Sequence, residues 1–205
     1  MIHVQDLKVD FGSHSLFGGL SFHVKAGEKV AVKGESGSGK STLLHTLLGF
    51  IPQFEGHIEI DGLALNPSNI HEIRRRTSWV PQDLRFTVFP TVREMFYAPF
   101  RFKNNRHLMP RPEEMERIFH AFEISEDLLD RQIKEISGGQ KQRLILAAAV
   151  LLRKPVLLLD EPTSALNVEI KNKITDYLLG LEGITLMAAT HDEYFISKAD
   201  RIINL

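Results

Sequence analysis

A glycine-rich segment that ends in a lysine and a serine is the strongest chemical signal in the sequence. Residues 34–41 fit the pattern G-x-x-x-x-G-K-S/T, in which glycines let successive backbone N–H groups curl around phosphate oxygens. Lys40 adds a cation, Ser41 offers a hydroxyl to Mg²⁺, and the helix expected after the loop attracts anions at its start. A glycine turn without a ligand is the alternative. We expect the phosphates of a nucleotide to be bound by Gly34, Glu35, Ser36, Gly37, Ser38, Gly39, Lys40, Ser41 and Thr42.

Two adjacent carboxylates follow a continuous apolar stretch. Residues 156–159 are all Val or Leu, which is typical of a parallel strand buried on both faces, and Asp160 and Glu161 come directly after them. At the carboxyl end of such a strand, Asp160 can hold Mg²⁺ and Glu161 can polarise an attacking water. This pair is common on its own. Downstream of a phosphate loop it predicts hydrolysis of a nucleoside triphosphate.

The composition excludes several other kinds of chemistry. The 205-residue chain has a net charge of −1, so its charge does not favour nucleic acid or an anionic membrane surface as a partner. It has no cysteine, which excludes disulfides, thiolate catalysis and cysteine-bound metals. The longest apolar run covers only residues 144–152, whereas a bilayer span needs about 20 residues. The first residues also lack a secretory signal, so we expect a chain that does not cross a membrane by itself.

The elements that must position these residues alternate between strands and helices. Strand-like segments lie at residues 2–7, 20–24, 29–33, 58–60, 78–80, 156–159 and 184–189. Residues 84–137 carry four prolines and a helical periodicity, and a capping box at residues 91–94 predicts a short helix that stops before Pro99.

These segments predict an α/β fold. We expect a P-loop NTPase core with a mainly parallel sheet, an N-terminal antiparallel β-subdomain and an inserted helical subdomain. Residues 1–205 would form a single domain, with the core and β-subdomain at about 1–83 and 138–205 and the helical subdomain at about 84–137.

Further motifs resemble those of ATP-binding cassettes. Residues 136–140 are similar to the LSGGQ signature of that family, with Ile in place of Leu. Residues 79–82 resemble its Q-loop, residues 164–167 its D-loop and residues 190–192 its switch-histidine loop. Phe11 matches the aromatic position that stacks on adenine. The resemblance covers essentially the whole chain.

The resemblance implies a function that needs two chains. In the family, two cassettes pack head to tail, and each ATP lies between one phosphate loop and the signature of the other cassette. Ser137, Gly138, Gly139 and Gln140 would then bind the partner's ATP, and one chain that carries both half-sites would form an ATP-dependent homodimer. The resemblance makes ATP and Mg²⁺ the cofactors. It assigns catalysis to Lys40, Glu161 and His191, and the metal to Ser41, Gln82 and Asp160.

The family resemblance also implies a membrane partner. We expect the ATP-hydrolysing subunit of a transporter, in the cytoplasm and held at the inner face of the cell membrane by a separate permease subunit. The compact form is similar to bacterial exporter cassettes of the iron-export type, on residues 91–106 and 128–143, with lipoprotein-release and peptide-export cassettes as alternatives. Aromatic residues between Phe86 and Phe102 are expected to receive a helix of the permease. The cargo and the direction of transport would be determined by the permease.

Two other classes of function remain as alternatives. The first is a cassette ATPase that acts on ribosomes or DNA, but such proteins carry two cassettes or a long coiled coil between the phosphate loop and the signature. The second is a small-molecule kinase, which would have no use for the signature motif. Three positions depart from the family pattern: Asn167 replaces the usual D-loop aspartate, residues 147–149 lack the usual arginine, and Phe11 replaces the more frequent tyrosine. We interpret Arg74, Arg75 and Arg76 as a solvated face and expect no nucleic-acid partner.

Overall fold

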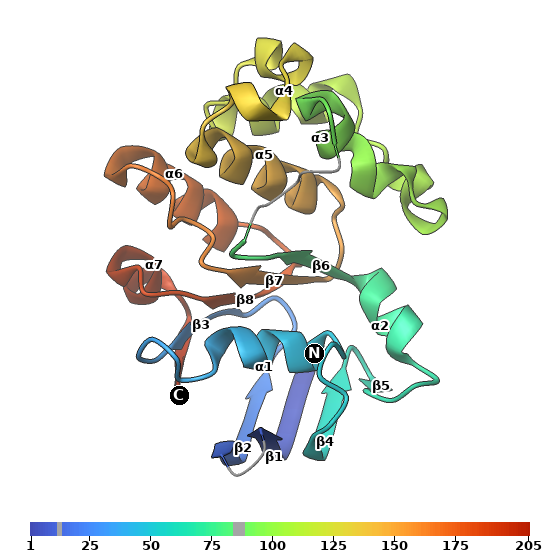
Figure 1. The fold of residues 1–205 in the computed structure, drawn as a ribbon, viewed down its shortest axis with the longest axis vertical. Coiled ribbons are helices and arrows are strands. Elements are labelled where there is room, and N and C mark those ends of the chain that lie inside the picture. The colour runs from blue at the N-terminus through green and yellow to red at the C-terminus, as the bar shows by residue number, and fades with distance from the viewer. Residues whose placement is uncertain (12–13, 84–88) are drawn as a thin grey trace.

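Two sheets and a layer of helices make up the fold in a computed structural model of the chain, which describes residues 1–11, 14–83 and 89–205 (Figure 1). The strands are β1 (Ile2–Phe11), β2 (His14–Val24), β3 (Lys29–Lys33), β4 (Glu55–Ile60), β5 (Leu63–Ala64), β6 (Thr77–Val80), β7 (Val156–Asp160), β8 (Thr185–Ala189) and β9 (Arg201–Asn204). The α-helices are α1 (Lys40–Leu47), α2 (Ile70–Arg76), α3 (Val92–Arg101), α4 (Pro112–Ala121), α5 (Gly138–Leu151), α6 (Val168–Leu179) and α7 (Glu193–Lys198). Short 3₁₀ helices are η1 (Lys103–Leu108), η2 (Glu126–Asp130) and η3 (Ile133–Glu135).

The strands form one antiparallel and one parallel sheet. The antiparallel sheet has the order β2-β1-β4-β5, and the parallel sheet has the order β6-β7-β8-β3-β9. Because neighbouring strands of the second sheet are parallel, the carboxyl ends of β6, β7, β8 and β3 meet at one edge, where such sheets bind ligands. The predicted α/β fold, with its parallel sheet, antiparallel β-subdomain and helical insertion, is confirmed.

Each central strand of the parallel sheet sends alternate side chains into two hydrophobic cores. Val30 and Val32 of β3 pack with α1 and the antiparallel sheet, whereas Ala31 joins the core that includes α5 and the inserted helices. β7 and β8 alternate in the same way. Figure 1 shows α1 between the two sheets, and α5 and α6 on the opposite face of the parallel sheet. Burial on both faces explains why these strands are continuously apolar.

Residues 89–137, before α5, fold mainly as helices that pack on α5. The two ends of this segment are joined by backbone bonds: the Val92 N–H donates to Arg131 O (3.0 Å), and the Ile133 N–H donates to Pro90 O (3.3 Å). Inside the segment the Phe96 ring meets the Phe119 ring edge-on at 5.4 Å, so α3 and α4 share a core. Within the described residues, no helix combines the length and hydropathy that a membrane span requires.

One helix boundary differs from the prediction, because α3 does not stop before Pro99 but continues to Arg101. The Thr91 hydroxyl accepts from the Glu94 N–H, as a cap should (3.2 Å). Phe96 and Phe100, on either side of the proline, are both buried, and Asn105 Nδ2 donates to Pro99 O at 2.9 Å. Packing on both sides therefore outweighs the hydrogen bond that the proline removes from the helix.

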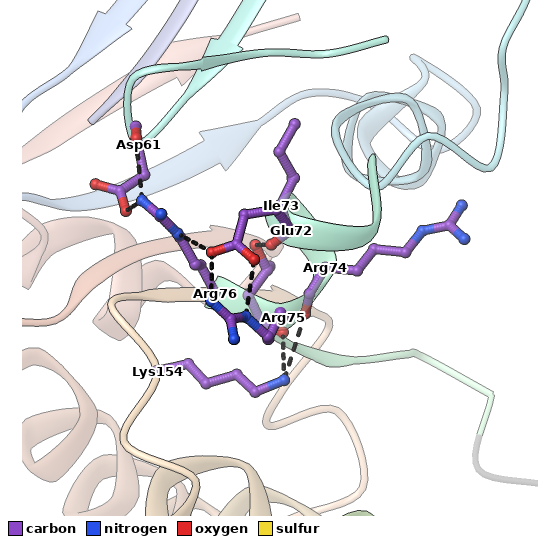
Figure 2. A network of polar contacts seen from close by, with 8 residues as sticks. Asp61, Glu72, Ile73, Arg74, Arg75, Arg76 and Lys154 are labelled. Carbon is purple, nitrogen blue, oxygen red and sulfur yellow. Dashed lines mark hydrogen bonds and ion pairs between the residues drawn. The ribbon is translucent and has the colours of Figure 1, made fainter. Parts of the chain in front are cut away.

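Two of the three arginines of α2 differ from the expected solvated face, whereas Arg75 is exposed as expected. Arg74 donates to the carbonyls of Leu48 (2.9 Å) and Gly49 (3.1 Å), which follow the last turn of α1. Arg76 pairs with Asp61, in the turn between β4 and β5, at 2.8 Å. Figure 2 shows Arg75 and Arg76 converging on Glu72, with the Lys154 ammonium at the end of the helix. Arg74 and Arg76 thus attach α2 to the end of α1 and to the turn between β4 and β5.

Candidate functional site

The glycine-rich loop joins β3 to α1 and lies against β2. Gly39 is the N-cap of α1 and has a φ of 98°, in the left-handed region that favours glycine. A Cβ at this position would lie 2.7 Å from the Leu16 side chain and 2.9 Å from the Phe17 ring. The path of the loop around the start of α1 therefore requires glycine here.

Lys40 and Ser38 supply polar groups that a phosphate can satisfy. The Lys40 side chain is buried, and its ammonium donates to the carbonyls of Gly34 and Glu35, both at 2.9 Å. The Ser38 hydroxyl oxygen is buried and has no hydrogen-bond partner among the described residues. Buried donors normally have partners, and anionic oxygens are strong acceptors for them. The loop therefore fits the phosphates of a nucleotide.

Asp160, at the end of β7, lies beside the first turns of α1. Its side chain is buried, and burial raises the pKa of the carboxyl, while a hydrogen bond from Ser41 and the proximity of His45 and Lys40 lower it. A carboxylate and a hydroxyl are hard oxygen ligands, so Asp160 and Ser41 fit Mg²⁺. His45, one turn after Ser41, was missed in the sequence because a single histidine in a helix carries no signal.

Glu161 and His191 lie next to each other at the ends of β7 and β8. Glu161 Oε1 is 3.6 Å from His191 Nε2. Burial raises the pKa of Glu161, and His191 and Lys40 oppose that shift. Asp192 holds the histidine loop: its carboxylate accepts from Thr163 Oγ1 (3.1 Å) and from the Tyr194 N–H (3.0 Å), at the start of α7. The carboxylate that could polarise a water is thus half-enclosed beside an imidazole.

One cleft of about 360 Å³ collects most of these side chains. It is lined by Ser36, Gly37, Gly39, Lys40, Ser41, Thr42, Gln82, Asp160, Glu161, Ser164 and His191. Gly34 and Glu35 contribute through the carbonyls that bind Lys40. A larger hollow of about 840 Å³ continues past Gln82 to His45 and Trp79. Phe11 ends β1, but its side chain lies outside the described residues.

The signature residues lie elsewhere in the chain's own structure. Ser137 is the N-cap of α5: its hydroxyl accepts from the Gln140 N–H (3.2 Å), and Gln140 Oε1 accepts from the Ser137 N–H (2.8 Å). A Cβ on Gly139 would lie 2.9 Å from Ala165 O, so this turn packs tightly on residues 164–166. Among the described residues, those that line the phosphate cleft do not include residues 137–140.

Two amide side chains near this turn bind backbone groups. Gln142, which the sequence analysis missed, donates to Glu161 O and accepts from the Ala165 N–H, both at 2.9 Å. A single glutamine in a helix gives no sequence signal for such contacts. Asn167 caps α6, because its Oδ1 accepts from the Ile170 N–H at 3.0 Å. The residue that departs from the usual aspartate therefore has a local structural role.

A second, apolar cleft of about 300 Å³ lies between β6 and the inserted helices. It is lined by Ser78, Trp79, Pro81, Met95, Phe96, Pro99, Ile145, Ala148, Ala149 and Leu152. Ala148 and Ala149 belong to the run that lacks the usual arginine, and their small side chains leave this space open. Of the aromatic residues expected to form a docking surface, Phe96 and Phe100 are buried, Tyr97 is partly buried and Phe102 is exposed, while Phe86 lies outside the described residues.

The sequence is similar to those of ABC transporter ATP-binding proteins. A sequence profile described as "ABC transporter" matches residues 17–164. The "Energy-coupling factor transporter ATP-binding protein EcfA1" of Bacillus licheniformis is 36% identical over 191 residues, which cover 90% of this chain and 66% of that protein. This chain thus spans about two thirds of the length of that relative. The "Glutamate/aspartate import ATP-binding protein GltL" of Escherichia coli K12 is 33% identical and is covered over 86% of its length.

A solved structure has the same fold. It is described as the "Dimeric structure of a post-hydrolysis state of the ATP-binding cassette MJ0796 bound to ADP and Pi". The TM-score is 0.85 and the sequence identity 27%, with 100% of this chain and 94% of the other covered. The likeness therefore extends over the parallel sheet, the antiparallel sheet and the inserted helices together.

Proposed function

Because this chain belongs to the ABC transporter family, we propose that it hydrolyses MgATP in the cleft between the glycine-rich loop and the end of β7. One observation carries the proposal: segments far apart in the sequence bring Lys40, Ser41, Asp160, Glu161 and His191 into one cleft of about 360 Å³. A glycine turn with only a structural role would not explain a buried ammonium, two carboxylates and an imidazole at the same sheet edge.

Each side chain has a role that its position allows. Lys40 and the loop N–H groups bind the phosphates, and Ser41, Asp160 and Gln82 hold Mg²⁺, which neutralises phosphate charge when bound. Glu161 takes a proton from the attacking water while the new O–P bond forms at the γ-phosphorus and the bond to the bridging oxygen of ADP breaks. His191, which lines the same cleft, would donate to the γ-phosphate. Phe11 would stack on the adenine.

A second copy of the chain completes each site. Residues 137–140 do not line the chain's own cleft among the described residues, yet they begin α5, whose N–H groups can bind an anion. In a head-to-tail pair this turn would face the γ-phosphate bound by the partner. The dimeric relative bound to ADP and Pi supports this arrangement. Two copies related by a two-fold axis would then hold two nucleotides.

We further propose that a membrane-spanning subunit docks at the apolar cleft lined by Trp79, Phe96 and Ile145. The cleft begins directly before Gln82, so a change at the nucleotide would reach it over a short path. This subunit would hold the chain at the inner face of the cell membrane. One of the relatives reported above is named for glutamate and aspartate import, which supports uptake. None of those three relatives is described as an iron exporter, so the likeness to that type has no support from them.

The catalytic part of the proposal is tested by Glu161→Gln. This change keeps the shape and removes the charge that polarises the water, so ATP should persist and the dimer should accumulate. Light scattering should show dimers when the variant is mixed with MgATP. Without nucleotide, the chain should be mainly monomeric. Steady-state phosphate release should fall by about 100-fold or more.

Glu193→Gln is the matched control, since Glu193 is exposed on α7 and pairs only with Lys33 in the contacts found. It should hydrolyse ATP as the unmodified chain does. Normal hydrolysis by Glu161→Gln would show that Glu161 is not the catalytic carboxylate. Rapid phosphate release from chains held as monomers would contradict the shared site.

A further inference from the structure

Glu161 has a backbone conformation that few residues other than glycine adopt, with a φ of 48°. Such a conformation persists only where neighbouring groups hold it. The Glu161 N–H donates to Ala189 O of β8 at 2.8 Å. Its carbonyl accepts from Ser164 Oγ at 3.1 Å and from Gln142 Nε2 at 2.9 Å. Because φ and ψ set the direction of the Cα–Cβ bond, these hydrogen bonds also aim the carboxylate.

Gln142 is the donor that comes from a separate helix, α5. Its side chain is buried, with 2% of the residue exposed. Both ends of its amide are used, since Nε2 donates to Glu161 O while Oε1 accepts from the Ala165 N–H at 2.9 Å. A buried amide that is satisfied at both ends is held in one orientation. Gln142 therefore fixes residues 161 and 165 relative to α5.

The same helix carries the signature residues. Gln142 follows Gly139 by three positions, so the two lie on one face of α5. Both meet Ala165: a Cβ on Gly139 would approach its carbonyl oxygen to 2.9 Å, and Gln142 accepts from its N–H. Since α5 is one continuous helix, a movement of its first turn carries Gln142 along.

We propose that Gln142 is a positioning residue for ATP hydrolysis. It holds the Glu161 peptide so that the carboxylate faces the attacking water, and it ties that orientation to the place of the signature helix. The proposal rests on the proposed role of Glu161 as the base. Gln142 touches no substrate, so its loss should slow the hydrolytic step and leave ATP binding intact.

Gln142→Met tests this, because methionine keeps the length of the side chain and removes both hydrogen bonds. The kcat for MgATP should fall by about tenfold or more, while KM stays within about threefold. Gln142→Glu keeps the acceptor for the Ala165 N–H, and while it is ionised its carboxylate cannot donate to Glu161 O. It should lose kcat in the same way, with a larger loss of thermal stability than Gln142→Met, because the new charge is buried beside a carbonyl oxygen.

A double-mutant cycle separates positioning from a general structural role. In the Glu161→Gln background the carboxylate is already gone, so adding Gln142→Met should change the residual single-turnover rate by less than about twofold. Asn105→Leu is the matched control: Asn105 is also a buried amide that donates to a backbone carbonyl, that of Pro99, at 2.9 Å. This control should lower stability and keep kcat.

Three outcomes would overturn the proposal: unchanged kcat in both Gln142 variants, an equal loss in both Glu161 backgrounds, or an equal loss in Asn105→Leu. Failure of the proposed function gives a different result, namely wild-type hydrolysis by Glu161→Gln alone. The two failures can therefore be told apart.

Discussion

Among the described residues that line the cleft, Lys40 is the one lysine or arginine, and the glycine-rich loop encloses its ammonium. Of all single-residue substitutions, its removal should therefore lower ATP hydrolysis the most. Lys40→Ala should lower ATP hydrolysis by about 100-fold or more and weaken ATP binding, because the phosphates lose a charge-assisted bond in a partly desolvated site. Nucleotide binding by calorimetry and phosphate release measure the two effects. Lys33→Ala, at an exposed lysine nearby, is the control. Wild-type turnover in Lys40→Ala would refute the assignment of this loop.

Asn167 offers a milder test at the same scale. Its Oδ1 caps α6, and aspartate is an equally good N-cap, so Asn167→Asp should fold with unchanged stability. We expect turnover to change by less than about tenfold, equivalent to about 1.4 kcal/mol of barrier. Thermal unfolding and steady-state hydrolysis would measure both. Complete loss of activity would mean that the dimer contact has adapted to the uncharged amide.

Residues with a proposed chemical role could be predicted from the sequence, whereas a residue that contacts the backbone of the site could not. Lys40, Ser41, Asp160 and Glu161 stood out by type and spacing, Gln82 and His191 through the family resemblance, and the structure gathers all six in one cleft. Gln142 did not stand out, because its partners are a carbonyl and an N–H of residues about 20 positions away. The identity of those residues reveals nothing about their backbone contacts.

At the scale of elements, an ion pair joins the start of β3 to the start of β9. Glu28 accepts from Arg201 Nε and from the Lys25 N–H, both at 2.6 Å, and the Arg201 hydrogen bond lowers the pKa of Glu28. A lowered folded-state pKa gives stability that is complete above the unfolded pKa, about 4.3, and is lost as pH falls through the folded value.

Glu28→Gln should therefore reduce the free energy of unfolding by about 1–3 kcal/mol at pH 7. The difference from the unmodified chain should shrink as the pH drops below about 4. Urea unfolding at a series of pH values would measure it. Glu55→Gln, at an exposed pair with Lys8, should have almost no effect at any pH. A difference for Glu28→Gln that stays constant with pH would contradict the role of its charge.

Local sequence rules predicted some elements well and others poorly. Continuous apolar runs predicted β7 and β8, because burial on both faces leaves no polar position in such strands. The proline rule failed at α3, where the packing of Phe96 and Phe100 keeps the helix going. Arg74 and Arg76 were misread for a similar reason, since their partners at residues 48, 49 and 61 become neighbours only in the fold.

At the scale of the whole molecule, the proposed docking of a membrane-spanning subunit at the apolar cleft can be tested. Ile145 is partly buried and lines this cleft. Ile145→Ser should leave the basal ATPase of the isolated chain within about threefold, while stimulation by the membrane subunit and transport fall about tenfold or more. Reconstitution in vesicles with the co-purified membrane subunit would measure both. Met109→Ser, at an exposed side chain outside residues 86–102 and outside the cleft lining, is the control. Unchanged stimulation in Ile145→Ser would exclude this cleft as the docking site.

The signature turn lies apart from the chain's own phosphate cleft, and this separation has a genetic consequence. A fault in the glycine-rich loop and a fault in the signature, carried by different alleles, would complement each other. When the two mutant chains form a mixed dimer, one nucleotide site contains an intact loop and an intact signature. The other site contains both mutated motifs. A cell that expresses both alleles would regain part of the activity that neither gives alone, whereas two alleles damaged in the same motif would not.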